Sequence, residues 1–273
     1  MVQVIWPDSG LVEVSDRGLA YGDGLFETIR VDRGRPFLLE RHLQRLLEDA
    51  GRLTIPLDRA ALEAAMQEAL ERLAPADAAC VLKVILTRGS GGRGYRIPDT
   101  TRPRLIFSVH PMPPVPDAGG VVASTSSVPL VVHPAMAGMK SLERMQQVLA
   151  SRELQPDEFE RIMPDSDGNL LEGTRTNLLL QSGDVWITPP RESLAVAGVM
   201  RAELLDCLQQ QGRQTEQRAI TRYDLDADRL QGLWLTNSVT GIVAVRSLDG
   251  VELPVSSHLA TIAPHGFFTG SSA

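Results

Sequence analysis

The sequence predicts an α+β protein of two domains, and three observations lead to this class. The chain has 273 residues, which is long for a single domain. Segments with strand-like character and segments with helical periodicity occur in both halves of the chain. Residues 111–120, PMPPVPDAGG, are rich in proline, end in two glycines and show no periodicity, as linkers do. We therefore expect a small N-terminal domain at 1–111, a linker at 112–120 and a larger C-terminal domain at 121–273.

The N-terminal domain is expected to combine strands with two amphipathic helices. QVIW and LVEVS, within residues 3–15, predict a hairpin around the turn PDSG. Residues 38–53 place apolar side chains at helical spacing, and 58–73 repeat this pattern with Asp58 as a plausible N-cap. Further strands are expected at 25–31, at CVLKVILTRG (80–89) and at RLIFSVH (104–110).

The C-terminal domain continues the mixture of strands and helices. A strand at 121–132 precedes a loop and a helix at 141–154, which would present Leu142, Met145, Val148 and Leu149 on one face. Residues 159–180 predict three strands, separated by the turn DSDGN and the polar elbow EGTRTN. A helix follows at about 198–211, closed by Gly212, and two strands flank the polar TNS at 236–238.

Composition excludes several classes of protein. The net charge of −7 argues against non-specific nucleic-acid binding, which needs a basic surface. No apolar run approaches the ~20 residues of a membrane span, and the N-terminus lacks the pattern of a signal peptide. Two cysteines suggest a reduced compartment, so we expect a cytoplasmic protein. The five histidines show no spacing typical of metal ligands, so no protein-bound metal is expected.

Lys140 is notable because lysine is rare in this chain. Only Lys83 and Lys140 occur among 27 basic residues, so arginine supplies nearly all positive charge. An arginine guanidinium stays protonated, whereas a lysine amine can lose its proton and attack a carbonyl. Scarcity alone is also consistent with an arginine-biased composition. Lys83, inside CVLKVILT, is interpreted as an ordinary strand residue.

Three further groups, considered together with Lys140, indicate a cofactor-binding site. The helix that begins at Gly198 and Val199 offers free backbone N–H groups, a natural anion site. The TNS segment adds hydroxyls and amides at a strand end, and Glu172 adds an acid. Each is weak alone, since many helices begin at glycine and Glu172 could be a surface acid. An amine, a carboxylate and an anion site are together what pyridoxal phosphate (PLP) requires.

These residues belong to a series of motifs that resembles the fold-type IV PLP enzymes. The family includes branched-chain aminotransferases, D-amino acid transaminases and 4-amino-4-deoxychorismate lyases. The matching segments, in chain order, are DRGLAYGDGLFETIRV (16–31), ERHLQRL (40–46), TRGSGGRGY (87–95), GMKSLERMQQVLA (138–150), DGNLLEGTRTNLLL (167–180), AGVMR (197–201) and TNSVTG (236–241). The resemblance implies a small N-terminal α/β domain and a larger domain with a mixed sheet or pseudo-barrel flanked by helices. It also implies a homodimer with active sites near the interface.

The resemblance implies roles for residues that bind the cofactor. Lys140 matches the lysine that forms the imine with PLP, and Glu172 matches the partner of the pyridine nitrogen. Arg45 matches the phosphate-binding arginine, although without the family it would be interpreted as part of a solvated helix face. The phosphate contacts of the family fall on the residues of two segments, Gly198 and Val199 in the first and Thr236 and Asn237 in the second.

The resemblance also implies how a substrate would bind. Arg93 and Tyr95 lie where D-amino acid enzymes carry carboxylate-binding side chains that are donated across a dimer interface. Thr28 lies in the strand that lines the substrate side of the cofactor. It could relay a proton to a leaving group or, alternatively, be an ordinary β-branched strand residue.

Within the family, SGGRGY and the lysine segment most resemble the lyase. Aminotransferases that place a tyrosine on the cofactor ring hydroxyl carry it five residues after the lysine, and here that position is Met145. We therefore expect elimination from 4-amino-4-deoxychorismate, giving 4-aminobenzoate and pyruvate. The alternatives are a D-amino acid or branched-chain aminotransferase of the same fold and, from a different class, a non-catalytic phosphate- or vitamin-binding protein.

Overall fold

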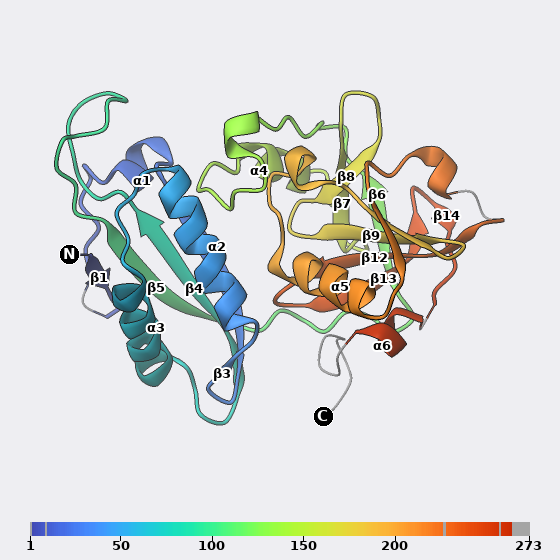
Figure 1. Ribbon diagram of the computed structural model, residues 1–273, viewed down its shortest axis with the longest axis horizontal. Helices are drawn as coiled ribbons and strands as arrows, with labels where there is room; N and C mark the ends of the chain where they lie inside the picture. Colours follow the sequence, from blue (N-terminus) through green and yellow to red (C-terminus); the bar gives the residue numbers. More distant parts are fainter. Residues whose placement is uncertain (1, 9, 226–227, 257, 264–273) are drawn as a thin grey trace. The chain divides into compact units, whose positions relative to one another are not determined.

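The computed structural model describes residues 2–8, 10–225, 228–256 and 258–263 (Figure 1). The chain divides into two compact units. Unit 1 consists of Met1–Met112 and Met139–Glu143, and unit 2 consists of Pro113–Gly138 and Arg144–Ala273. The segment that contains Lys140 therefore groups with the N-terminal unit, although it is flanked on both sides by chain of unit 2.

Unit 1 contains a mixed sheet with two long helices on one of its faces. In the described residues the strand order is β1-β5-β4-β2-β3, with β1 parallel to β5 and the other neighbours antiparallel. The elements of unit 1 are β1 Gln3–Ile5, α1 Arg17–Tyr21, β2 Gly24–Asp32, β3 Arg35–Pro36, α2 Leu39–Arg52, α3 Arg59–Leu73, β4 Ala79–Thr87 and β5 Arg104–Pro111.

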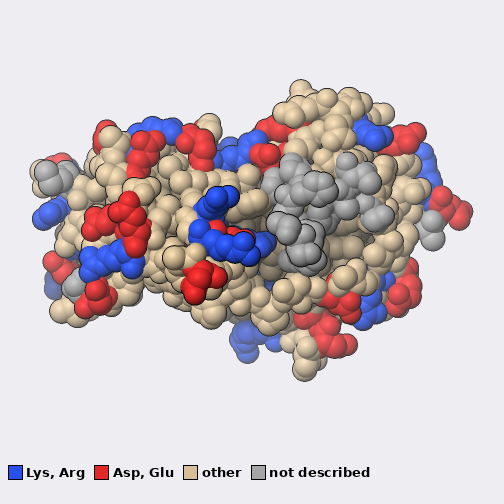
Figure 2. Space-filling view, turned by 90° about the horizontal axis from the view of Figure 1, so that it is seen from below, with Lys and Arg blue, Asp and Glu red and all other residues tan. Residues whose placement is uncertain are grey.

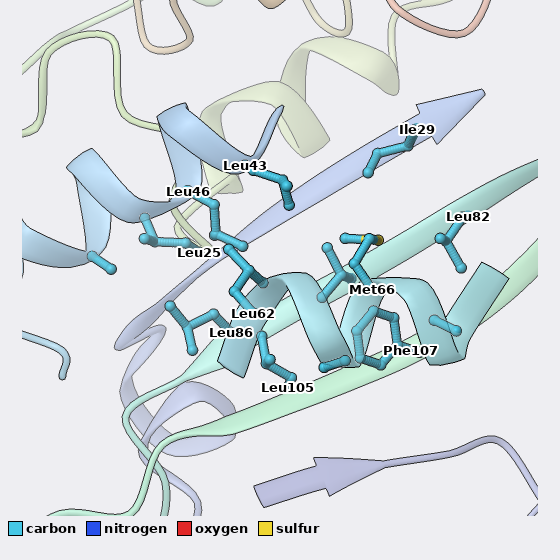
Figure 3. Packing of buried hydrophobic residues seen from close by; sticks show 14 of the residues in the cluster. Leu25, Ile29, Leu43, Leu46, Leu62, Met66, Leu82, Leu86, Leu105 and Phe107 are labelled. Atoms are coloured by element: carbon cyan, nitrogen blue, oxygen red, sulfur yellow. The ribbon is translucent and has the colours of Figure 1, made fainter. Parts of the chain in front are cut away.

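The core of unit 1 lies between the sheet and the helices α2 and α3, as Figure 3 shows. Alternate residues of β2 face this core, among them Leu25 and Ile29. They pack with Leu46 of α2 and Leu62 of α3, all four nearly inaccessible to solvent. Because side chains alternate along a strand, the intervening residues of β2 lie on the opposite face of the sheet.

The two predicted helices of this unit are confirmed, and the predicted hairpin is wrong. The Asp58 side chain accepts a hydrogen bond from the N–H of Ala61 (3.0 Å), so Asp58 is the N-cap of α3. Residues 11–15 do not form a strand, and β1 pairs in parallel with β5, where Gln3 lies opposite Arg104. The turn signal at PDSG was local, whereas the partner strand is about a hundred residues away in the chain.

Unit 2 is built on a mixed sheet that closes on itself. The strand order of the described part is β11-β10-β9-β12-β13-β6-β7-β8, with β14 beside β13. Glu172 of β8 pairs with Asn177 of β9, so the strands from β9 through β12, β13, β6 and β7 to β8 form a closed ring. This confirms the α+β class and the pseudo-barrel that the sequence resemblance implied.

The elements of unit 2 follow in chain order. They are β6 Val121–Thr125, a 3-10 helix Pro134–Met136, α4 Met145–Ser151, β7 Glu160–Pro164, β8 Leu170–Gly173, β9 Asn177–Ser182, β10 Val185–Thr188, a 3-10 helix Arg191–Ser193, α5 Val199–Gln210, β11 Gln214–Gln217, a 3-10 helix Arg222–Leu225, β12 Leu230–Asn237, β13 Gly241–Leu248, β14 Val251–Glu252 and α6 His258–Ile262. The helix expected at 198–211 is thus present as α5, and Gly212 follows it with the left-handed backbone (φ 67°) of a helix end.

The helix expected at 141–154 is shorter than predicted. It begins only at Met145, because Ser141 forms a β-bridge with Leu25 and residues 139–143 run beside β2. The side chains of Met145 and Val148 are 64% and 54% exposed, so the apolar face predicted for this helix is not buried within the chain.

The surface mixes both signs of charge. Figure 2 shows lysine and arginine side chains interspersed with aspartate and glutamate over the face in view. Across the described residues, no helix has both the length and the apolar character needed to cross a membrane.

Candidate active site

The Lys140 segment extends the sheet of unit 1 as an additional edge. The N–H of Phe26 donates to the carbonyl of Lys140 (3.0 Å), and the N–H of Leu142 donates to the carbonyl of Gly24 (3.0 Å). The N–H of Lys140 also lies 3.4 Å from Oδ2 of Asp49, a buried residue of α2. These contacts fix the backbone of the lysine against β2 and α2.

Strand alternation then decides where the side chains of the segment point. Met139 and Ser141 are 1% and 2% exposed, so they occupy the core side of β2. Lys140 lies on the opposite side with Phe26, and its Nζ is 4.2 Å from the centroid of the Phe26 ring. A cation at this distance over an aromatic face is attracted by the ring quadrupole.

Thr28 shares this face of β2, two residues beyond Phe26. It is half-buried and pairs in register with Lys83 of β4. The Nζ of Lys83 lies 5.3 Å from the centroid of the same Phe26 ring. Lys83 is a strand residue, as predicted. Both lysines of the chain and the hydroxyl of Thr28 thus gather on one strand face.

Arg45 lies on the core side of β2 and is bound to a carboxylate. Its Nε and Nη2 donate to Oε1 and Oε2 of Glu27, at 2.8 and 2.5 Å. Nδ1 of His42 lies 2.6 Å from Oε2 of Glu27. Arg45 is therefore part of a largely buried cluster rather than a solvated helix face, which settles one of the alternatives for this residue.

The pKa values of this cluster are shifted by burial and by charge. Burial raises the pKa of Glu27, but the charge of Arg45 and the hydrogen bond from His42 outweigh it and lower the pKa to about 2. The pKa of His42 is lowered, chiefly by burial and further by the charges of Arg45 and Lys140, which together outweigh the effect of Glu27. The cluster thus holds an ionised carboxylate and a neutral imidazole at pH 7.

Arg93 and Tyr95 lie in the long loop between β4 and β5. Both are exposed, and Tyr95 keeps 86% of its surface accessible. The loop is attached to α1, because the guanidinium of Arg17 donates to the carbonyls of Gly94 (3.1 Å) and Tyr95 (3.2 Å). The ring of Tyr21 meets that of Tyr95 edge to face, with centroids 5.5 Å apart. An exposed arginine and tyrosine are thus held at the surface of unit 1.

In unit 2 three polar residues form a row across adjacent strands. Glu172, Asn177 and Thr236 are paired in register, with Asn177 in the middle. All three are buried, at 3%, 5% and 2% exposure. Oε2 of Glu172 accepts a hydrogen bond from the N–H of Val196 (3.1 Å). The row places the predicted acid and one predicted phosphate contact on the two strands that flank β9.

Asn177 connects this row to the start of α5. Its Nδ2 donates to the carbonyl of Val196 (2.9 Å), and its Oδ1 accepts from the N–H of Gly198 (2.9 Å). A Cβ on Gly198 would lie 2.1 Å from that Oδ1, so only glycine allows this close approach. Asn177 therefore fixes the chain that leads into the helix.

The start of α5 and Thr236 fit the phosphate group of a cofactor. The first N–H groups of α5, beginning at Val199, have no intrahelical acceptor, and Gly198 has no side chain to cap them. The Oγ1 of Thr236 is buried and has no hydrogen-bond partner among the described residues. Free amides at a helix start and an unsatisfied buried hydroxyl are groups that an anion would satisfy.

Two other residues singled out in the sequence do not join these buried clusters: Asn237 stabilises a turn, and Met145 lies exposed at the start of a helix. Oδ1 of Asn237 accepts from the N–H groups of Val239 (2.9 Å) and Thr240 (2.8 Å), so this side chain holds the turn between β12 and β13. Met145 begins α4 with an exposed side chain.

Two residues of these clusters were missed by sequence reasoning. Glu27 had a visible signal, because in LFETIRV it occupies the same strand phase as Leu25, Ile29 and Val31, which are apolar. A charge in the core phase of a strand needs a partner. Asn177 had no such signal, since nothing local marks it as the residue that fixes the 196–198 segment.

Comparison with known proteins identifies the family. Residues 24–248 match the model of the family described as Amino-transferase class IV. An aminodeoxychorismate lyase from Vibrio harveyi is 31% identical over 248 residues, with 88% of this chain and 89% of that protein covered. The crystal structure of 4-amino-4-deoxychorismate lyase from Pseudomonas aeruginosa is 40% identical, with a TM-score of 0.86 and 93% of each chain covered.

The PLP-bound form of a hypothetical aminotransferase from Mycobacterium tuberculosis is also similar. It has 28% identity, a TM-score of 0.77 and coverage of 94% of this chain and 92% of the other. The chain belongs to the class IV aminotransferase family, that is, to the fold-type IV PLP enzymes. Its cofactor is PLP, which confirms the expectation from the sequence.

Proposed function

We propose that this enzyme is a 4-amino-4-deoxychorismate lyase that supplies 4-aminobenzoate for folate biosynthesis. One observation carries the choice of reaction: the side chains of Lys140 and Thr28 share one face of β2 with the ring of Phe26. An elimination needs a base for a carbon-bound proton and a proton donor for a leaving oxygen. An amino transfer has no leaving oxygen. The similarity to 4-amino-4-deoxychorismate lyases supports the same choice.

The proposed reaction divides the chemistry between cofactor and protein. When bound, PLP would supply an electron sink for the amine-bearing carbon of the substrate. Lys140 removes the proton from that carbon, and the bond from the neighbouring carbon to the enolpyruvyl oxygen breaks. The hydroxyl of Thr28 relays to the departing oxygen the proton that Lys140 has taken up, so both groups return to their starting protonation states. The ring becomes aromatic as 4-aminobenzoate, and the released enol becomes pyruvate.

The remaining predicted residues receive roles in binding. We propose that Glu172 holds the pyridine nitrogen protonated, since it is a buried carboxylate in unit 2. The phosphate would be bound by Arg45, by the free amides at the start of α5, which begin at Val199 next to Gly198, and by the segment of Thr236 and Asn237. The substrate carries two carboxylates, and a planar guanidinium binds a carboxylate through two hydrogen bonds.

The exposed loop between β4 and β5 supplies the proposed carboxylate site. We assign it to Arg93 together with Tyr95, both exposed in unit 1. The proposed functional form is a homodimer in which these side chains act near the subunit interface. Light scattering during gel filtration tests the dimer, and a monomer with full activity would contradict it. The two cysteines are not joined in a disulfide, which supports the proposed cytoplasmic location.

The decisive experiment is an assay with 4-amino-4-deoxychorismate. We expect 4-aminobenzoate and pyruvate in equal amounts, and loss of both products in Lys140→Ala. A Thr28→Val enzyme should turn over more slowly, by about 10²-fold if the hydroxyl is a general acid. An unchanged turnover number in Thr28→Val would contradict the role of the hydroxyl.

The alternative function is an aminotransferase acting on D-amino or branched-chain amino acids. It would transfer an amino group to 2-oxoglutarate and release no 4-aminobenzoate. A non-catalytic binder, the third possibility at the level of sequence, would take up PLP without forming an imine with Lys140. Loss of the imine absorbance band in Lys140→Ala separates that possibility from both enzymes.

A further inference from the structure

A single charged residue interrupts the apolar row by which β2 faces the core of unit 1. Leu25, Ile29 and Val31 in this row are at most 1% exposed, and so is Glu27. A buried carboxylate is strongly unfavourable unless charged or hydrogen-bonding partners compensate the loss of water. Glu27 therefore persists in this core through the groups that surround it.

Those groups come from two successive turns of α2. Arg45 donates twice to the carboxylate, through Nε to Oε1 (2.8 Å) and through Nη2 to Oε2 (2.5 Å). His42, which is fully buried, contacts Oε2 at 2.6 Å through Nδ1. A neutral imidazole has one N–H, and a carboxylate can only accept, so that proton resides on Nδ1. Nε2 of His42 is consequently an acceptor, and it has no partner among the described residues.

This geometry fixes the orientation of Arg45. The contact uses the edge of the guanidinium formed by Nε and Nη2, so Nη1 is directed away from Glu27. A free arginine has many rotamers, and ordering it when a ligand binds weakens affinity. Here the Arg45 side chain is already ordered by Glu27 of β2, and His42 of α2 in turn holds Oε2 of Glu27.

We propose that Glu27 and His42 are positioning residues that hold Arg45 oriented for the phosphate group of PLP. This inference rests on the proposed role of Arg45 in phosphate binding, and it names what makes that arginine effective. A simpler role would be a structural link between β2 and α2. The two roles predict different effects on binding. Loss of a structural link should weaken PLP and pyridoxal equally, whereas loss of a positioning residue should weaken only PLP, which carries the phosphate.

The test compares PLP with pyridoxal, which lacks the phosphate. Apoprotein of each variant is titrated with both compounds. The dissociation constant of pyridoxal divided by that of PLP measures the contribution of the phosphate, and this quotient is the ratio used below. In Glu27→Gln we expect PLP to bind about tenfold more weakly, the size of one hydrogen bond to a charged group, while pyridoxal binding is unchanged. In an Arg45→Met background, Glu27→Gln should have no further effect on the ratio.

The matched control is Glu40→Gln. Glu40, also on α2, accepts two hydrogen bonds from Arg59 (2.7 and 2.8 Å), but it is exposed. This variant should leave the ratio unchanged. His42→Leu removes both the donor and the unsatisfied nitrogen with a side chain suited to a core. We expect it to keep the melting temperature of the apoprotein and to lower the ratio by about two- to threefold, a smaller loss than for the charged pair.

Three results would overturn the proposal. Equal losses of PLP and pyridoxal affinity in Glu27→Gln would indicate a structural link. An unchanged ratio in a folded Glu27→Gln variant would exclude a positioning role. If Glu27→Gln does not fold, an unchanged ratio in His42→Leu would exclude it instead. An unchanged ratio in Arg45→Met would remove the premise about phosphate binding. None of these results bears on whether 4-aminobenzoate is formed, so the proposed lyase activity is tested separately.

Discussion

Replacing Asn177 by alanine should weaken both the stability of unit 2 and its affinity for PLP. The substitution removes the two hydrogen bonds that hold the chain at Val196 and Gly198, each 2.9 Å long. Each neutral hydrogen bond contributes about 1 kcal/mol to the free energy of unfolding. Both backbone groups are partly accessible to water, which replaces part of what is lost. We therefore expect a loss of about 1–2 kcal/mol, or about 2–8 °C in melting temperature.

The effect on PLP should exceed what the loss of stability explains. The Gly198 backbone leads directly into the amides at the start of α5, and Asn177 is the side chain that fixes it. Once this restraint is removed, those amides must be ordered when the phosphate binds, and affinity falls. Thermal unfolding of the apoprotein by circular dichroism measures the first effect, and titration with PLP measures the second.

Gln181→Ala is the matched control for this experiment. Gln181 lies on the same strand, is equally buried and also makes two side-chain contacts. Its Nε2 donates to the carbonyl of Gly183 (3.0 Å), and its Oε1 lies 3.0 Å from Nδ1 of His258. Its loss should lower the melting temperature by a similar amount and leave the affinity for PLP unchanged. If Asn177→Ala and Gln181→Ala bind PLP equally well, Asn177 does not prepare the start of α5 and the reasoning fails.

Three further predictions follow from the same contacts. Gly198→Ala should lower the melting temperature more than Asn177→Ala, because a Cβ would lie 2.1 Å from Oδ1 of Asn177; equal melting temperatures would count against this close approach. The lowered pKa of Glu27, about 2 against 4.5 in the unfolded chain, stabilises the fold above pH 4.5, and this contribution is lost as the pH falls toward 2. Urea unfolding across this range should show that loss, and Arg45→Met should shift it to higher pH by removing the charge that lowers the pKa. Arg93→Ala should raise the KM for 4-amino-4-deoxychorismate by about tenfold or more, as expected for the loss of an arginine–carboxylate contact, and unchanged kinetics would contradict the assignment.

The elements that the sequence predicted best are those whose signals are local. Asp58 is the N-cap of α3, and Gly212 follows α5, because capping depends on residues within one helical turn. The strand at 25–31 was also found, since its alternation is independent of what it pairs with. These features need no knowledge of distant parts of the chain.

The errors concern pairing between distant segments. The parallel contact of Gln3 with Arg104 gives no local signal, so a hairpin was predicted in its place. Helical spacing continued back to residue 141, but the pairing of Ser141 with Leu25 overrode it. Sequence spacing describes what a segment can form, and the competing partner decides what it does form.

The candidate site was predictable in its chemistry and not in its supports. Lys140 was proposed from its scarcity and from its motif, and Glu172 was proposed from its motif. Without the family resemblance Arg45 would have been interpreted as part of a solvated helix face, whereas it forms an ion pair with Glu27 that only the packing of α2 on β2 establishes. Supporting residues are recognised by their contacts with distant parts of the chain, and a single sequence does not show these contacts.

The gathering of both lysines around Phe26 makes this chain unusually simple to label. An amine-selective reagent finds side-chain targets only at Lys83 and Lys140, in addition to the α-amino group. Both nitrogens lie near one aromatic ring, at 5.3 and 4.2 Å from its centroid. Reductive methylation with a ¹³C reagent would therefore place two methyl probes in the ring current of Phe26. Their resonances would report on that one strand face of the apoprotein, without interference from other lysines. Because a dimethylated Lys140 can no longer form an imine, any change on adding PLP would report its non-covalent binding.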